Sequence, residues 1–457
     1  MYPISPEFIR QAEAYLGTDE AAALCAALEG QPGVSLRPNP RKPACLFPDI
    51  SAEPVAWSAS GRYLSLRPEF TLDPLFHAGC YYVQEAASMF VERAFAALPA
   101  PPARLLDLCA APGGKSTLWR SLLPDEALLV ANEPIRSRAE VLSENLQKWG
   151  HPGVVVTNAY PDELGGLRNF FDVVAADVPC SGEGMFRKDE EARREWSPEN
   201  VAACADRQWQ IISDIWPALR PGGHLIYSTC TFNPDEDERS VARICRELGA
   251  EPVPIDVEPS WGIVGDTTGS GLPVYHFFPH RARGEGFFLA LLRKREEAVQ
   301  PTPRTGKRRK NSVRLPKEAL RLGQWLQTPD NFALWADAEG RVSAISRQWA
   351  EDAEMLRASV RTLLCGIPLA EPKGPKYLPA HGLALSTARS EAAFPRAALS
   401  RTEALAYLRR ETVTLGSDVP RGYVLVTYEG QALGFVNNLG SRANNLYPPC
   451  WRIRKQL

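Results

Sequence analysis

The chain has 457 residues, more than one ordinary hydrophobic core accommodates, and this length predicts roughly two to four domains. Hydrophobic residues make up 44% and charged residues 23%, a balance typical of a soluble globular protein, and no apolar run approaches the roughly 18 residues of a membrane helix. The first residues lack a basic segment followed by an apolar core, so we expect no secretory signal and a cytoplasmic location. The net charge of −2 argues against a histone-like nucleic-acid binder.

The number and spacing of the cysteines limit the kinds of metal site and disulfide that the chain can form. Ten cysteines are spread along the chain, and none of them forms a Cys-x-x-Cys pair. A zinc site is therefore not expected, and we predict neither a metal nor a membrane as a partner. A disulfide framework is not expected either, because the chain is long and shows no export signal. Any chemical role of a thiol has to be argued from its local sequence.

The first segment, residues 1–76, is predicted to be an α+β extension. Two helical patterns cover Pro6–Leu16 and Asp19–Leu28, and Pro-rich loops and short β-like runs such as Gly33–Arg37 follow.

The second segment, residues 77–297, alternates apolar strand-like runs with amphipathic helical patterns. Helices are expected over Arg138–Trp149 and Asp206–Leu219, where apolar residues recur on one face. This alternation predicts an α/β domain with a mostly parallel, doubly wound sheet. The expected strands are Leu105–Leu108, Ala127–Ala131, Val154–Thr157, Asp172–Ala176, His224–Tyr227 and Phe287–Leu292.

Three shorter segments complete the predicted organisation. Residues 298–316 form a basic linker whose run Arg304–Lys310 either attracts phosphates or is merely solvated, two interpretations that charge alone does not separate. Residues 317–388 are predicted to be an intermediate α+β domain with a helix at Pro316–Trp325. Residues 389–457 carry a helix at Arg401–Arg409 and a β-hairpin from Gly422–Tyr428 to Gln431–Val436, a β-rich pattern.

A glycine-rich turn follows the first strand of the α/β segment, in the string Asp107-Leu-Cys-Ala-Ala-Pro-Gly-Gly-Lys-Ser-Thr117. Such a turn before a helix lets backbone N–H groups approach a ligand closely. A P-loop is excluded because Cys109 stands where it needs glycine, and the G-x-G-x-x-G fingerprint is absent. The next strand ends at Glu133, an acid suited to ribose hydroxyls. The pattern favours a nucleoside without phosphates, such as S-adenosylmethionine, over a plain tight turn.

Two thiols and a carboxylate leave neighbouring strands of the predicted sheet. One strand ends in Asp177-Val-Pro-Cys180, and the next ends in Tyr227-Ser-Thr-Cys230. Carboxyl ends of strands in open α/β sheets are where ligands bind, so these groups are expected to meet in one crevice. A single cysteine there is best explained as a buried core residue, but two at successive strand ends beside Asp177 indicate function.

These strings resemble the RNA cytosine-C5 methyltransferases of the NOL1/NOP2/Sun family. The resemblance includes Tyr82–Ser88 before the first strand and Phe278–Phe288 after the sheet. The string Asn444–Pro448 and the hairpin before it are similar to the PUA-like tail of the family's bacterial small-subunit rRNA branch, which also has an N-terminal RNA-binding extension. The resemblance therefore implies a Rossmann-like methyltransferase sheet flanked by an N-terminal α+β RNA-binding extension and a C-terminal PUA-like β-rich domain.

The resemblance also implies catalytic roles. Cys230 corresponds to the thiol that adds to C6 of cytosine, and Cys180 to the thiol that helps the covalent adduct break down. Asp177 is implied to hydrogen-bond the base or to orient the methyl donor. In DNA cytosine methyltransferases the Pro-Cys thiol is itself the nucleophile, so Cys180 is the rival candidate.

Binding residues follow from the same resemblance. The S-adenosylmethionine site is implied to contain Cys109, Ala110, Ala111, Pro112, Gly113, Gly114 and Lys115 around the methionine end, Glu133 at the ribose, Asn158 at adenine, and Asp177. The substrate RNA is expected at Arg138, Asn145, Pro179 and Lys188, with ordinary surface polarity as the alternative for Arg138, Asn145 and Lys188.

The expected partner is RNA, in particular 16S rRNA or the small ribosomal subunit, bound by a monomer. A target cytosine has to be single-stranded or flipped out of its stack to reach the thiol. One alternative keeps the reaction and changes the substrate to tRNA. A second alternative is a non-catalytic RNA-binding or assembly protein, which is disfavoured because both cysteines, Asp177 and the turn are retained. A third is a DNA methyltransferase, which has no need of Cys230.

Overall fold

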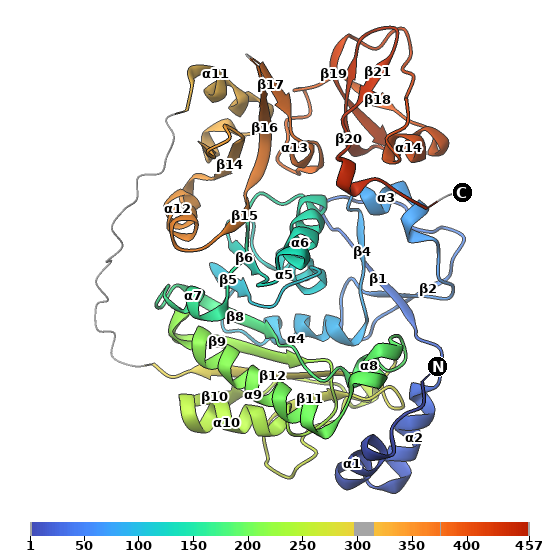
Figure 1. Cartoon of the computed structure of the whole chain (residues 1–457), viewed down its shortest axis with the longest axis vertical. Helices are drawn as coiled ribbons and strands as arrows, with labels where there is room; N and C mark the ends of the chain where they lie inside the picture. The colour runs from blue at the N-terminus through green and yellow to red at the C-terminus, as the bar shows by residue number, and fades with distance from the viewer. Residues whose placement is uncertain (1, 297–314, 375, 456–457) are drawn as a thin grey trace.

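The computed structural model describes residues 2–296, 315–374 and 376–455. Among these residues, a nine-stranded sheet lies at the centre, with strand order β10-β12-β9-β8-β5-β6-β7-β15 and with β11 beside β12 (Figure 1). Strand order reverses between β5 and β8, and such a switch point opens a crevice at the carboxyl ends of the strands. The parallel strands are β5 (Arg104–Asp107), β6 (Leu128–Asn132), β7 (Val154–Thr157), β8 (Phe171–Asp177) and β9 (Leu219–Thr229).

Antiparallel strands extend both edges of this sheet. β12 (Phe287–Lys294) pairs with β9, and β10 (Ala250–Val253) and β11 (Val274–Phe277) pair with β12. At the other edge, β15 (Thr362–Cys365) pairs antiparallel with β7. β15 lies within the 317–388 segment, so this segment completes the central sheet as well as forming one of its own, which the sequence patterns did not indicate.

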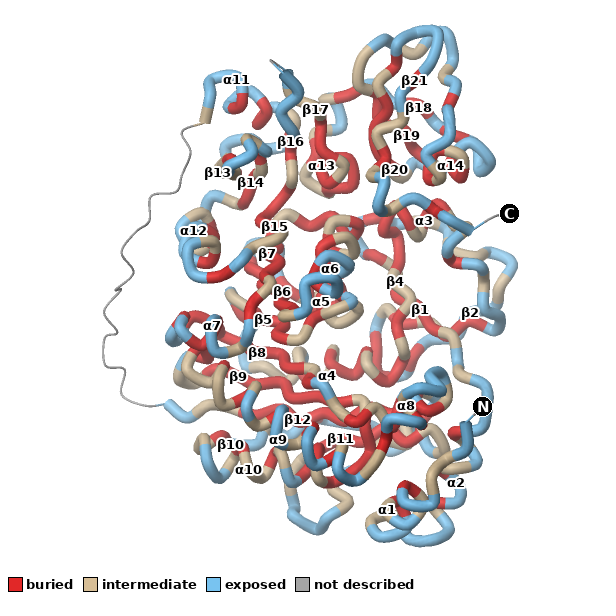
Figure 2. Tube along the Cα trace, in the orientation of Figure 1, coloured by how far each residue is buried: buried red, intermediate tan, exposed pale blue. Residues whose placement is uncertain are grey.

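Helices cover both faces of the sheet, and its strands are buried along most of their length (Figure 2). Strands β6 and β7, which are apolar except for their last residues, Asn132 and Thr157, suit this position, because a parallel sheet is covered on both sides. One face packs against α4 (Val91–Ala96), α5 (Gly114–Leu122) and α6 (Arg136–Trp149). The other packs against α7 (Pro161–Gly165), α9 (Pro198–Ile215), α10 (Glu238–Leu248) and α12 (Ala350–Ser359).

The N-terminal extension consists of two parts that pack in different places. Helices α1 (Pro6–Leu16) and α2 (Thr18–Leu28) bury Phe8 and Leu24 against Phe186 and Trp196, in the segment that follows β8. A separate four-stranded sheet has the order β2-β3-β1-β4. Its elements are β1 (Val34–Pro38), β2 (Ala52–Pro54), β3 (Arg62–Leu64) and β4 (Tyr81–Val83), with α3 (Pro74–His77) before β4.

The C-terminal third contains two further sheets. The predicted hairpin is confirmed as β19 (Gly422–Tyr428) and β20 (Gln431–Asn438), which pair antiparallel. The helix expected at 316–325 is only α11 (Lys317–Leu320) followed by a 3₁₀ segment (Arg321–Trp325) that contains the poor helix former Gly323.

The remaining helices and strands complete the description. They are α8 (Glu190–Glu195), β13 (Phe332–Ala336), β14 (Val342–Ser346), β16 (Ile367–Lys373), β17 (Lys376–Pro379), α13 (His381–Leu385), β18 (Arg396–Ala398), α14 (Arg401–Leu408) and β21 (Ala443–Asn445).

The last unit shares a hydrophobic core with the N-terminal sheet. Leu36 and Tyr81 from that sheet belong to the same buried cluster as Leu405, Val424 and Tyr447. The two chain ends therefore stabilise each other.

Most of the predicted basic linker, including Arg304–Lys310, lies outside the described residues. In the part of the chain that is described, no helix has the length and apolar character needed to cross a membrane, and no group of three or more His, Cys, Asp or Glu side chains is arranged to hold a metal.

Candidate active site

The glycine-rich turn leaves β5 at the crevice and is held open by its neighbours. Gly113 has φ 113°, a conformation that favours glycine, and an added Cβ there would lie 3.2 Å from a Leu142 methyl group. Asn145 Nδ2 donates to Pro112 O at 2.8 Å, and Arg138 donates to Ala111 O at 3.3 Å. Both residues were predicted to contact RNA, and both hold the turn in this structure.

A buried arginine from the N-terminal extension also supports the turn. Arg37, on β1, is fully buried and donates to Gly114 O at 3.2 Å and to Thr117 Oγ1 at 2.7 Å. Burial lowers the pKa of Arg37 to about 9. Sequence reasoning missed Arg37, because a lone arginine in a β-like run gives no signal of its distant partners.

The acid after β6 lies beside the turn. Glu133 is 2% exposed, and its carboxylate accepts a hydrogen bond from the Ile135 N–H at 3.0 Å and approaches Arg138 at 3.5 Å. Asn158 Nδ2 donates to Glu133 O at 2.9 Å and to Pro134 O at 2.8 Å, so this side chain fixes the backbone around Glu133. The fully buried Asn132 amide, also missed, ties β6 to Leu108 O and Ala159 O.

The carboxylate at the end of β8 forms an ion pair across the switch point. Asp177 Oδ2 lies 2.8 Å from Lys115 Nζ, and Asp177 Oδ1 accepts from Ser228 Oγ at 2.8 Å. Burial alone would lower the pKa of Lys115, but Asp177, and next Cys230, raise it above its usual value. The lysine of the turn is thus directed at the groups that leave β8 and β9.

The two predicted thiols meet. Cys180 Sγ lies 3.1 Å from Cys230 Sγ, and the Cys230 N–H donates to Cys180 Sγ at 3.4 Å. Both cysteines are free and half-buried. The hydrogen bond to Cys230, together with burial, raises the pKa of Cys180 well above its usual value. Cys180 therefore favours the protonated thiol beside the sulfur of Cys230.

A buried polar network fixes the loops that carry the thiols. Glu236 is fully buried and accepts hydrogen bonds from the Ser181 N–H at 3.0 Å, from Gln208 Nε2 at 2.7 Å and from Asn233 Nδ2 at 2.8 Å. Gln208 also donates to the carbonyl of Pro179 at 3.0 Å. Burial raises the pKa of Glu236 to about 7. Sequence reasoning missed Glu236, and the only hint in the sequence was its position shortly after Asn233-Pro234.

One more predicted RNA residue lies beyond Cys180. Lys188 Nζ approaches Glu285 Oε1 at 3.5 Å, and the neighbouring Arg187 donates to Glu285 Oε2 at 2.7 Å. These two cations share one buried carboxylate, that of Glu285.

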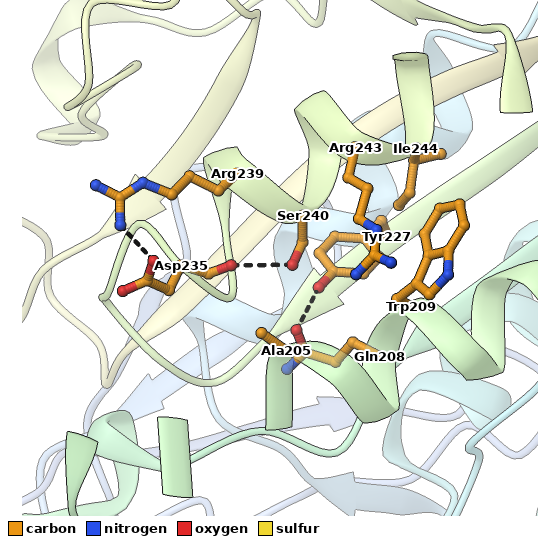
Figure 3. Close-up of a pocket in the computed structure, with 9 residues that line it drawn as sticks. All are labelled: Ala205, Gln208, Trp209, Tyr227, Asp235, Arg239, Ser240, Arg243 and Ile244. Atoms are coloured by element: carbon orange, nitrogen blue, oxygen red, sulfur yellow. Dashed lines mark hydrogen bonds and ion pairs between the residues drawn. The ribbon is translucent and has the colours of Figure 1, made fainter. Parts of the chain in front are cut away.

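A cavity of about 160 Å³ lies between α9, α10 and the end of β9 (Figure 3). Tyr227 and Gln208 line it and are joined by a hydrogen bond of 2.9 Å, and Trp209 and Arg243 line it as well. Neither thiol is among its lining residues, so this cavity is distinct from the crevice that holds the thiols.

The fold and the site together define an S-adenosylmethionine-dependent methyltransferase. A Rossmann-like sheet carries a glycine-rich turn after its first parallel strand and an acid after the second, without a phosphate motif. Family profiles match three parts of the chain: the N-terminal domain of 16S rRNA methyltransferase RsmF over residues 4–86, 16S rRNA methyltransferase RsmB/F over 95–293, and the methyltransferase RsmF PUA domain over 394–453.

Curated relatives extend this match to most of the chain. A ribosomal RNA small subunit methyltransferase F from Erwinia tasmaniensis is 32% identical over 410 residues, which cover 86% of this chain and 84% of the relative. The protein of the same name from Citrobacter koseri is 34% identical over 421 residues, covering 87% and 84%. The chain belongs to the ribosomal RNA small subunit methyltransferase F family. The predictions of an RNA methyltransferase, of its cofactor and of both flanking domains are confirmed.

Solved structures agree on the fold. A methyltransferase homolog from Pyrococcus horikoshii is 24% identical and covers 64% of this chain and 100% of its own, with a TM-score of 0.53. NSun6 from Pyrococcus horikoshii with SFG is 19% identical and covers 65% and 100%, with a TM-score of 0.55.

Proposed function

We propose that this protein transfers a methyl group from S-adenosylmethionine to C5 of cytosine in 16S rRNA, through a covalent bond between Cys230 and C6 of the base. The observation that carries the proposal is the pair of thiols, 3.1 Å apart, at the carboxyl ends of adjacent strands. The ion pair between Asp177 and Lys115 lies in the same crevice. Such a constellation suits a reaction in which a thiol first adds to a base and is later expelled.

The first step is the addition of the Cys230 thiolate to C6. A new S–C6 bond forms, and the electron pair of the C5–C6 bond becomes available at C5. Asp177 offers a carboxylate acceptor to the exocyclic amine of the base, and Lys115 offers an ammonium that stabilises negative charge developing on the ring.

The second step restores the aromatic base. When bound, S-adenosylmethionine would supply an electrophilic methyl group to C5, with cleavage of its S–CH3 bond, and would leave as S-adenosylhomocysteine. Transfer of the C5 proton to water then frees the C–H electron pair, which restores the C5–C6 double bond as the S–C6 bond breaks, and Cys230 leaves as a thiolate. We assign Cys180 to this step because its sulfur lies 3.1 Å from the leaving sulfur and the hydrogen bond to Cys230, together with burial, raises the pKa of its thiol.

The residues around the turn fit the methyl donor. The open backbone at Gly113 and Gly114 leaves room for the methionine end, and we assign Cys109–Lys115 to it. Glu133 suits the ribose diol, because its buried carboxylate lies beside the turn, where it accepts from the Ile135 N–H and approaches Arg138 at 3.5 Å. Asn158 is assigned to the adenine end, where its side chain already orders the adjoining backbone.

The 16S rRNA substrate is supported by the names of the curated relatives. We assign Lys188 and Pro179 to the RNA side of the crevice, with the N-terminal extension and the PUA domain as further RNA contacts, and we propose that the chain acts as a monomer. Arg138 and Asn145 bind carbonyls of the turn, so their contribution to RNA binding is expected to be indirect.

The experiment that tests this function identifies the product. The protein is incubated with S-adenosylmethionine and either a 16S rRNA transcript or a tRNA pool, and digested nucleosides are analysed by mass spectrometry. We expect 5-methylcytidine from the 16S transcript alone. Another methylated nucleoside would refute the C5 assignment, and 5-methylcytidine from tRNA alone would favour the tRNA alternative.

Cofactor binding should depend on Glu133 and not on the nucleophile. Glu133→Ala is expected to weaken S-adenosylmethionine binding by roughly 1–3 kcal/mol, because it removes a charge-assisted hydrogen-bond acceptor. Cys230→Ala should bind the cofactor almost as wild type, and Glu140→Ala, an exposed acid on the same helix as Arg138, is the matched control. Titration calorimetry that gave Cys230→Ala the larger loss would refute the cofactor assignment.

A further inference from the structure

A second cavity, of about 250 Å³, lies where three distant parts of the chain meet. One wall comes from the N-terminal extension around Lys42, a second from α13 and the loop up to Glu391, and a third from Arg396 and the β19–β20 turn. The elements α3, α13 and β20 lie side by side in Figure 1 and are in contact. The methyltransferase chemistry described above uses none of these residues.

The lining of this cavity is rich in cations. It contains Lys42, Arg389 and Arg396, together with Arg41, which pairs with Asp125 beside the cavity, and the one carboxylate among the lining residues is that of Glu391. Glu391 is shared, because it pairs with Arg389 at 3.1 Å and also with Arg396. Among the described residues, no carboxylate forms an ion pair with Lys42, whose ammonium donates to Ala78 O at 2.9 Å and Lys148 O at 2.6 Å.

Two of these cations are buried, and one of them has a nitrogen without a partner. Lys42 and Arg389 are each 7% exposed, and the Nε of Arg389 has no hydrogen-bond partner. Burial, reinforced by the charge of Arg389, lowers the pKa of Lys42 to about 7. Burial and Arg396 lower the pKa of Arg389 to about 10. Buried like charges beside one another destabilise the protein unless an anion accompanies them.

We propose that this cavity binds a backbone phosphate of the substrate RNA. A phosphate offers several oxygen acceptors to lysine and arginine donors and compensates the excess positive charge. The identity of the anion as RNA rests on the proposed function, and the PUA domain supplies one wall of the cavity. A phosphate held there bridges the N-terminal extension and the PUA domain, so both orient the RNA together.

The position of the cavity separates it from the chemistry. Lys42 binds the carbonyl of Lys148 in the last turn of α6, whereas Arg138, in the first turn, contacts the glycine-rich turn. A helix of this length spans about 20 Å. The phosphate therefore belongs to a nucleotide or RNA segment away from the target cytosine, and it contributes affinity and orientation.

The test uses two exposed residues of opposite charge, since the buried cations also hold backbone carbonyls. Binding of a 16S rRNA transcript to the full chain is measured over a range of salt concentrations without S-adenosylmethionine. Arg396→Gln is expected to weaken binding roughly tenfold and to lower the slope of log K against log salt by about 1. Glu391→Gln should bind more tightly than wild type, because it frees two arginines for the phosphate. Arg295→Gln, which removes an exposed arginine paired with Glu251 and remote from the cavity lining, should retain the wild-type slope.

The outcomes distinguish the sources of the anion. If Glu391 only anchors the loop, Glu391→Gln weakens RNA binding or leaves it unchanged, and the proposal is wrong. If inorganic phosphate raises the melting temperature of wild type and not of Arg396→Gln, while RNA binding is equal in both, the cavity holds a free anion and not RNA. Because neither cysteine takes part in this assay, failure of the C5 mechanism would leave its result intact.

Discussion

Cys180→Ala is expected to accumulate as a covalent protein–RNA complex that survives denaturing electrophoresis, whereas Cys230→Ala should form neither the complex nor 5-methylcytidine. The reason is that the two thiols serve opposite steps. Without Cys230 no S–C6 bond forms. Without Cys180 the bond forms but breaks slowly, because the group beside the leaving sulfur is gone. The measurement is a denaturing gel of wild type and both variants with 16S rRNA and S-adenosylmethionine.

Controls separate this mechanism from its rivals. Cys245→Ala, which removes a half-buried thiol on α10 outside the crevice, should behave as wild type. RNA containing 5-fluorocytosine should trap wild type itself, because fluorine at C5 is not lost as a proton is. A complex that arises only with Cys230→Ala would make Cys180 the nucleophile, as in DNA cytosine methyltransferases. No complex in any variant would indicate a non-catalytic protein.

The local parts of the fold and of the site could be predicted from the sequence. The hydrophobic patterns predicted α1, α6, β7 and β12 at the places where the structure has them. Such patterns are local, because a helix or strand that buries one face repeats its apolar residues within a short stretch of chain. The meeting of Cys180 and Cys230 followed from topology, since the carboxyl ends of parallel strands share one edge of the sheet.

Contacts between distant segments could not be predicted in this way. Nothing in the run around β15 indicates that it pairs with β7, about two hundred residues earlier, because a strand pattern does not specify its partner. The same holds for Arg37, whose partner Thr117 lies on α5. The sequence placed a basic linker at 298–316, ahead of the intermediate and PUA-like segments, and gave no sign that Val424 shares a core with Leu36. Point variants therefore test RNA binding better than truncation does.

A pair of glycines makes the thiol arrangement possible. The Gly184 N–H donates to Cys230 O at 2.9 Å, which holds the loop of the nucleophile against the loop of Cys180. The backbone of Gly184 also lies against that of Gly286, and this close approach is possible only because neither residue has a side chain. A Cβ added at Gly286 would lie 2.6 Å from Gly184 Cα and 2.6 Å from the Phe232 ring, and real Cβ contacts are not so short.

Gly286→Ala is therefore expected to displace the loop of Cys230. Overpacking of this kind costs about 1–3 kcal/mol of folding free energy, and a shift of about 1 Å in a reacting group lowers its rate roughly 100-fold. S-adenosylmethionine binding should persist, because the glycine-rich turn and Glu133 follow other strands.

Gly33→Ala is the matched control, since that glycine is exposed and has open space around it. Thermal unfolding, calorimetry and single-turnover methylation of all three proteins measure these effects. Wild-type methylation by a folded Gly286→Ala would show that the close approach of the two glycines does not position Cys230.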